Sequence, residues 1–143
     1  MNASGNIQYL TYEQIDKAKW DVCIDKAVNG LIYGYSFYLD NMADNWDALV
    51  LDDYEAVMPL TWKKKYSILY LYQPFLTAQL GVFGTTMSTE LLERFIQRIP
   101  VKFKYIDIYL NQQNVFSIPK FDLYKRSNYI LNMDKPYNYL YSK

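Results

Sequence analysis

The sequence contains no histidine and a single cysteine, Cys23, among its 143 residues. Without histidine the chain cannot form a Ser-His-Asp triad, a Cys-His dyad or a histidine-ligated zinc site. A single cysteine can form neither an internal disulfide nor a multi-thiolate metal site. These absences exclude several common classes of hydrolase and metalloprotein, and we expect no metal site.

An excess of one charge is also absent. Basic and acidic residues number 15 each, so no net charge draws the molecule towards nucleic acid or an anionic membrane. Residues 1–6 are polar, and apolar runs such as 56–60 are far too short to span a bilayer. We therefore expect a cytoplasmic protein with neither nucleic acid nor membrane as a partner.

Aromatic residues, by contrast, are plentiful: 16 Tyr, 7 Phe and 3 Trp make up 18% of the chain. Tyrosine joins a large apolar ring to a hydroxyl group, which suits half-buried sheets, wet clefts and interfaces alike. The length is that of one domain with its own core, which we expect to span residues 1–143. The aromatic excess either packs this core or forms a binding surface.

Hydrophobic periodicity predicts an α+β fold. The capping box Thr11-Tyr12-Glu13-Gln14 and the stop signal Asn29-Gly30 predict a helix over 12–27, and Ser88 begins another that Pro100 ends. The remaining expected elements are strands at 7–11, 31–35, 46–51, 55–62, 66–72 and 101–110, one bent strand or a hairpin at 121–133, a short helix at 37–42 and a helix after Pro136. This order predicts a mixed, mainly antiparallel sheet flanked by helices.

Most chemically suggestive motifs have a simpler structural interpretation. Cys23 lies on the apolar side of the first helix without a histidine to activate it, which favours a buried, inert thiol. The loop Gln79–Gly84 contains two glycines but lacks the lysine and Ser/Thr of a phosphate loop. Lys63-Lys64-Lys65 is typical of a solvated hairpin tip, although basic residues between aromatics can also bind single strands.

Carboxylate pairs are the other candidates for chemistry. Asp52-Asp53 fits a hairpin turn, and Asp21 with Asp25 fits the solvated face of a helix. Asp44 and Asp47 form a third pair, without a specific signal for acid–base work. Turn formation and solvation are the favoured interpretations of all these carboxylates.

The most distinctive segment is Ile68–Phe75, in which a strand ends at Pro74. It delivers Tyr72 and Gln73 to a sheet edge, next to Gln79, and amides beside aromatic faces often orient a polar ligand in a cleft. With two tyrosines of the 33–38 cluster, the candidate cleft residues are Tyr35, Tyr38, Tyr72, Gln73 and Gln79. Simple core packing of this segment is the alternative.

Several strings resemble a group of Bacteroidetes-type proteins related to GNAT and FemAB-like acyltransferases. The resemblance covers about residues 7–143. It depends on the strings 20–24, 29–40, 46–50, 57–62, 70–75 and 79–83, of which WDALV, VMPLTW, YLYQPF and QLGVF are the clearest.

The resemblance implies a GNAT-like amino-terminal half of a two-part protein, inactive alone, which supports the fold and the acceptor cleft. In such families the carboxyl-terminal half generally binds the acyl donor, so acyl-CoA is expected only in the whole protein. The pyrophosphate motif Q/R-x-x-G-x-G/A is not met, because Val82 stands three residues after Gln79. No catalytic residue can be transferred.

The implied partners are therefore the missing carboxyl-terminal half and a small-molecule or peptide acceptor. A non-enzymatic binding module is the alternative, with its tryptophans and tyrosines stacking on a glycan or nucleic acid or contacting a protein. A third interpretation is a structural domain that self-associates through an apolar patch.

Overall fold

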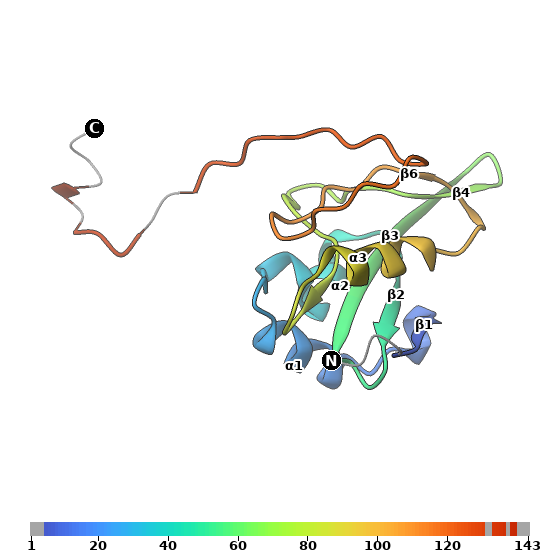
Figure 1. Ribbon diagram of the computed structural model, residues 1–143, viewed down its shortest axis with the longest axis horizontal. Coiled ribbons are helices and arrows are strands. Elements are labelled where there is room, and N and C mark those ends of the chain that lie inside the picture. The colour runs from blue at the N-terminus through green and yellow to red at the C-terminus, as the bar shows by residue number, and fades with distance from the viewer. Residues whose placement is uncertain (1–4, 131–132, 137, 140–143) are drawn as a thin grey trace.

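The computed structural model describes residues 5–130, 133–136 and 138–139, and it is an α+β fold built on a mixed sheet (Figure 1). The strand order is β1-β2-β3-β4-β6, and a short β5 pairs with the start of β3. All pairs are antiparallel except β4 with β6, which α3 connects as a crossover. The strands are β1 (Ile7–Leu10), β2 (Trp46–Leu51), β3 (Ala56–Lys65), β4 (Ile68–Leu71), β5 (Phe83–Gly84) and β6 (Phe103–Ile106).

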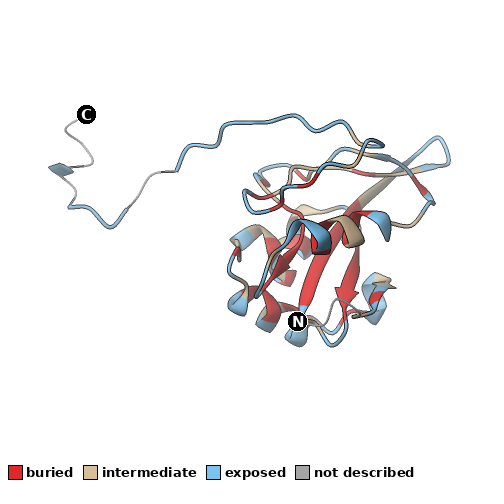
Figure 2. Ribbon diagram, viewed as in Figure 1, coloured by how far each residue is buried: buried red, intermediate tan, exposed pale blue. Residues whose placement is uncertain are grey.

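Helices cover both faces of the sheet. Within residues 5–130 the α-helices are α1 (Lys17–Lys26), α2 (Ser36–Met42) and α3 (Thr89–Gln97). All residues of β2 are buried, because alternate side chains enter two different cores. Leu49 and Leu51 pack in the core that contains the apolar side of α3, whereas Trp46, Ala48 and Val50 pack with α1 and α2. The buried residues accordingly concentrate in the central strands and on the inner sides of the helices (Figure 2).

The expected helix over 12–27 is divided in two. The capping box is present, but the helix that it begins is only a short 3-10 helix at Tyr12–Gln14. The Gln14 side chain accepts a hydrogen bond from the Thr11 N–H. Asp16 then caps α1 by accepting a hydrogen bond from the Lys19 N–H. Two N-terminal signals in succession start two helices, and the buried Ile15 lies between them.

The expected strand over 31–35 is wrong. Ile32–Gly34 forms a 3-10 helix that leads into α2. Gly34 packs so closely on Ile24 and Phe83 that a side chain there would meet both. The Trp20 indole N–H donates to the Gly34 carbonyl at 2.7 Å. Packing against α1, and not strand propensity, therefore determines the conformation of residues 31–35.

The hairpin between β3 and β4 turns later than expected. Lys63, Lys64 and Lys65 continue β3, and the turn falls at Tyr66 and Ser67, whose φ angles are 49° and 65°. Two consecutive positive φ angles define the type I′ turn, which matches the twist of a hairpin. The lysines thus lie along a strand, not at its tip.

Pro59 introduces no bulge, since β2 and β3 pair in unbroken register from Trp46 to Leu51. The Trp62 N–H points towards β2, where it donates to the Asn45 carbonyl. Backbone N–H groups of successive residues point to opposite edges of a strand, so the nitrogen of Pro59 points away from β2. On that edge residues 56–57 pair with β5 and residues 62–65 pair with β4, and position 59 lies between them. The proline nitrogen therefore lies where no ladder bond is needed.

The carboxyl-terminal prediction of a strand over 121–133 is wrong for the described residues. Residues 122–130 form no strand, are all exposed, and run away from the body (Figure 1). Residues 138–139 are helical, whereas Tyr137, Leu140 and Tyr141 of the expected helix lie outside the described residues. Within the described part of the chain, no helix has the length and apolarity needed to cross a membrane.

Candidate functional site

A hollow of about 390 Å³ opens where β1 ends beside β2. The last β1 pair joins Leu10 to Ala48, after which the chain turns away into the 3-10 helix at 12–14. The first two residues of β2 therefore lack a β1 partner and face the hollow. Its lining consists of Thr11, Tyr12, Glu13, Asp40, Ala43, Asp44, Asn45, Trp46, Asp47, Trp62 and Lys102.

Asp47 is the buried carboxylate of the hollow. It accepts hydrogen bonds from the Tyr9 hydroxyl and from the Tyr12 N–H, the latter at 3.0 Å. The Lys102 ammonium lies 4.0 Å from Asp47 and donates to the Tyr9 hydroxyl at 2.7 Å. Burial and the hydrogen bond to Asp47 raise the pKa of Tyr9 far above its ordinary value, so this phenol is neutral at physiological pH.

Asp40 is the second carboxylate, at the end of α2. The Lys17 ammonium binds it at 2.7 Å and the Trp46 indole N–H donates to it at 3.0 Å. Burial alone would raise the pKa of Asp40, but these two donors outweigh it and hold the pKa below its usual range. The same lysine lies 4.4 Å over the Tyr12 ring and donates to its hydroxyl.

Asp44 completes the set on the loop after α2. Lys63 of β3 pairs with it at 3.2 Å, and the Lys63 ammonium lies 4.4 Å over the Tyr72 ring. The Tyr72 hydroxyl accepts from the Asp44 N–H at 2.8 Å, and burial raises the pKa of this phenol. Tyr72, a predicted cleft residue, therefore supports the edge of the hollow through Asp44.

The three aspartates share one arrangement, in which a lysine pairs with the carboxylate and lies over a tyrosine ring. We call these clusters the lysine–tyrosine–aspartate rim: Lys17/Tyr12/Asp40, Lys63/Tyr72/Asp44 and Lys102/Tyr9/Asp47. Cation–π contact and ion pairing act together at each cluster. The rim gives the hollow one aromatic side chain, Tyr12, and three carboxylates that each face a lysine ammonium.

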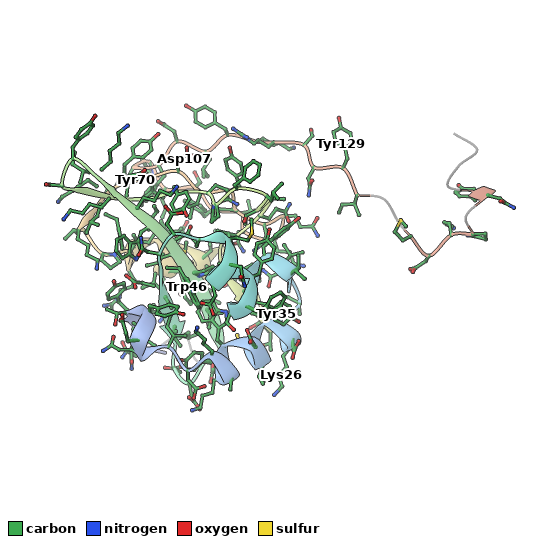
Figure 3. All side chains as sticks on the ribbon, turned by 180° about the vertical axis from the view of Figure 1, so that it is seen from behind. Lys26, Tyr35, Trp46, Tyr70, Asp107 and Tyr129 are labelled. Atoms are coloured by element: carbon green, nitrogen blue, oxygen red, sulfur yellow. The ribbon has the colours of Figure 1, made fainter. Side chains whose placement is uncertain are left out.

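The other predicted cleft residues do not line the hollow. Tyr38 and Gln73 both hold the turn at 74–77: the Tyr38 hydroxyl donates to Leu76 O, and the Gln73 amide donates to Thr77 O. Gln73 also accepts from the Tyr109 N–H, so both ends of its amide are bonded within the chain. Tyr35 donates to Asp25 on α1, apart from the hollow that Trp46 lines (Figure 3).

Gln79 is half-buried and begins the loop that resembles a pyrophosphate cradle. Alternate N–H groups of this loop are used internally: Leu80 donates to Tyr109 O, Val82 to the Asn114 side chain and Gly84 to the Asn29 side chain. A phosphate cradle needs such N–H groups free. The loop is therefore structural in this chain.

The loop is held by what we call the asparagine clamp: buried Asn29, Asn111 and Asn114. All three side-chain amides donate to the Val82 carbonyl, at 2.8, 3.2 and 3.1 Å respectively. Gly81 has a φ of 102°, and a Cβ there would collide with the Asn114 side chain. Side-chain amides thus replace the missing strand ladder around β5.

Cys23 is buried, as its place on the apolar side of the first helix predicts, and burial raises the pKa of its thiol to about 11. Among the described residues, no group of three or more acidic or cysteine side chains is placed to hold a metal ion.

The residues that sequence reasoning missed are Tyr9, Asp40 and Lys102. Asp44 and Asp47 were considered only as an unspecific pair. The sequence separations between partners reach 93 residues, from Tyr9 to Lys102. No local motif can signal such a cluster, because only the folded chain brings its members together from the strands, helices and loops that carry them.

Comparison of the chain with protein-family models, with curated proteins and with solved structures gives no match. The function of the chain must therefore be inferred from its own residues, its fold and the hollow.

Proposed function

We propose that this chain is the amino-terminal half of an acyltransferase-like protein, that it contributes the acceptor side, and that it binds no acyl donor by itself. The resemblance of the strings at 29–40, 57–62, 70–75 and 79–83 suggests this class. The observed order β-α-α-β-β-β-β-α-β, with a mixed sheet, is compatible with it.

The observation that carries the proposal is the internal use of the N–H groups at 80–84. Leu80, Val82 and Gly84 donate to other parts of the chain, so the loop has no row of N–H groups to offer a pyrophosphate. Donor binding would then belong to a second half. The hollow, with its polar lining, is the candidate place for the acceptor.

Isothermal titration with acetyl-CoA tests the proposal. We expect no heat of binding with the 143-residue chain and saturable binding with a protein extended beyond Lys143. Tight binding by the 143-residue chain would contradict the assignment of the donor site to the second half. Absence of binding by the extended protein would contradict the acyltransferase class itself.

A further inference from the structure

The charges of the hollow decide which ligands suit it. Asp40, Asp44 and Asp47 each face a lysine ammonium, at 2.7, 3.2 and 4.0 Å respectively. A cationic ligand would have to displace one of these lysines or accept repulsion from it. An anionic ligand would meet the carboxylates. A neutral ligand avoids both costs.

The carboxylates nevertheless keep hydrogen-bonding capacity. An ionised carboxylate accepts about four hydrogen bonds. Asp40 accepts from Lys17, Trp46 and Tyr12, and Asp44 accepts from the side chains of Lys63 and Tyr72. Both aspartates therefore have lone pairs left for donors, and hydroxyl groups are the neutral donors that match them.

Aromatic side chains form the apolar part of the hollow. Both Tyr12 and Trp62 line the hollow: Tyr12 is 39% exposed, and Trp62, on β3, is half-buried. The Trp62 indole N–H is buried and has no acceptor among the described residues. An unpaired donor of this kind calls for an explanation, and a ligand oxygen would satisfy it after a small rotation of the ring.

We propose that the hollow binds a neutral, hydroxyl-rich ring, a sugar or a sugar unit of a glycan. The volume of about 390 Å³ lies within the range of small-molecule sites. Hydroxyl groups bind Asp40 and Asp44, and the ring packs against Tyr12 and Trp62. This inference rests on the proposed function in one respect, that the hollow is the acceptor site. The binding of sugar can be measured with the 143-residue chain alone.

The three tryptophan indole N–H resonances of the 143-residue chain provide the measurement. A titration with neutral monosaccharides is expected to shift the Trp46 and Trp62 signals, because both residues line the hollow. The Trp20 N–H, which donates to the Gly34 carbonyl, serves as the internal reference and moves least. We expect saturation in the millimolar range, as for a small ligand with few contacts. A neutral oligosaccharide is the second arm: tighter binding than the monosaccharide identifies a glycan end, and equal binding identifies a free sugar.

Asp44→Asn is the matched test of the aspartate contact. Its side chain is 58% exposed, so we expect the fold to persist and the affinity for sugar to fall roughly tenfold. Asp53→Asn is the control, because Asp53 also pairs with a lysine, Lys19, but lines no part of the hollow. The control is expected to bind as the unchanged chain does, and the spectra themselves report whether each variant is folded.

Three results would overturn the inference: no shift with any neutral sugar, tighter binding of methylammonium than of sugar at the same signals, or equal loss of affinity in both variants. The two proposals fail separately. Sugar binding without acetyl-CoA binding by the extended protein would remove the acyltransferase proposal alone. Acetyl-CoA binding by the extended protein without sugar binding would remove this inference alone.

Discussion

Two polar regions of this molecule are built on opposite principles. The asparagine clamp consists of neutral amides that are buried and bonded to backbone groups of one loop. The lysine–tyrosine–aspartate rim consists of charged groups that bond mainly to each other and to tyrosines; Asp47 is buried, whereas the Lys17–Asp40 and Lys63–Asp44 pairs are partly exposed. The first region replaces a strand ladder, and the second borders a hollow.

The difference indicates where stability and binding reside. A buried amide that loses its partner leaves backbone groups unsatisfied, which costs about 1–3 kcal/mol for each group. A surface ion pair contributes about 0–1 kcal/mol. Substitutions in the clamp should therefore destabilise the fold, whereas substitutions in the rim should affect ligand binding more than stability.

Gly81→Ala should have the largest effect. The φ of 102° at this position is strained for alanine, and the new Cβ would collide with the Asn114 side chain in the centre of the clamp. We expect a loss of about 3 kcal/mol or more in the free energy of unfolding, measured by urea denaturation. Ser67→Ala, which also has a positive φ but lies in the exposed turn between β3 and β4, is the comparison. An equal loss of unfolding free energy in Ser67→Ala would contradict a particular contribution of the clamp to stability.

Asn114→Ala should have the next largest effect. Its side chain accepts from the Val82 N–H at 2.6 Å and donates to the Val82 carbonyl at 3.1 Å. Removing it leaves a buried N–H without a partner and should cost about 2 kcal/mol in a urea titration. Asn128→Ala, in the exposed carboxyl-terminal segment, should stay within about 0.5 kcal/mol. Similar values for the two variants would show that the clamp contributes nothing particular.

The sequence predicts the central part of the fold well and its polar regions poorly. The positions of β1, β2 and α2 follow from local hydrophobic patterns, and α3 follows from its apolar side together with the Ser88 cap. The strand predicted at 31–35 is wrong because the contact of Gly34 with Ile24 and Phe83 overrides strand propensity.

The clamp and the rim escape sequence reasoning for a common reason. Asn29 and Asn111 lie 82 residues apart, and Tyr9 and Lys102 lie 93 apart. Asparagine and lysine in loops have ordinary local explanations, so nothing in their neighbourhood marks them. The strand predicted over 121–133 fails differently: its alternation is real, but the described residues meet no strand partner.

Asp40→Asn should have an intermediate effect that depends on pH. The pKa of Asp40 is lowered in the folded state, so its contribution to stability is present above the ordinary carboxyl pKa and is lost as the pH falls through the folded value. We expect the variant to lose about 1 kcal/mol near neutral pH and progressively less as the pH falls below the ordinary carboxyl pKa. Urea denaturation of both proteins across this range measures the difference, and a gap that does not change with pH would exclude a charge effect.

Lys63→Gln should have the smallest effect and is the sharpest test of the comparison. The Lys63–Asp44 pair spans 3.2 Å, and its side chains are 37% and 58% exposed, so water screens it. We expect a change of less than about 0.5 kcal/mol in urea denaturation. Because Lys63 balances the charge of Asp44, the variant leaves an uncompensated carboxylate facing the hollow and should bind methylammonium more tightly than the unchanged chain does. A loss of stability as large as that of Asn114→Ala would instead make the rim part of the structural framework, and the separation between a rigid clamp and a ligand-binding rim would no longer hold.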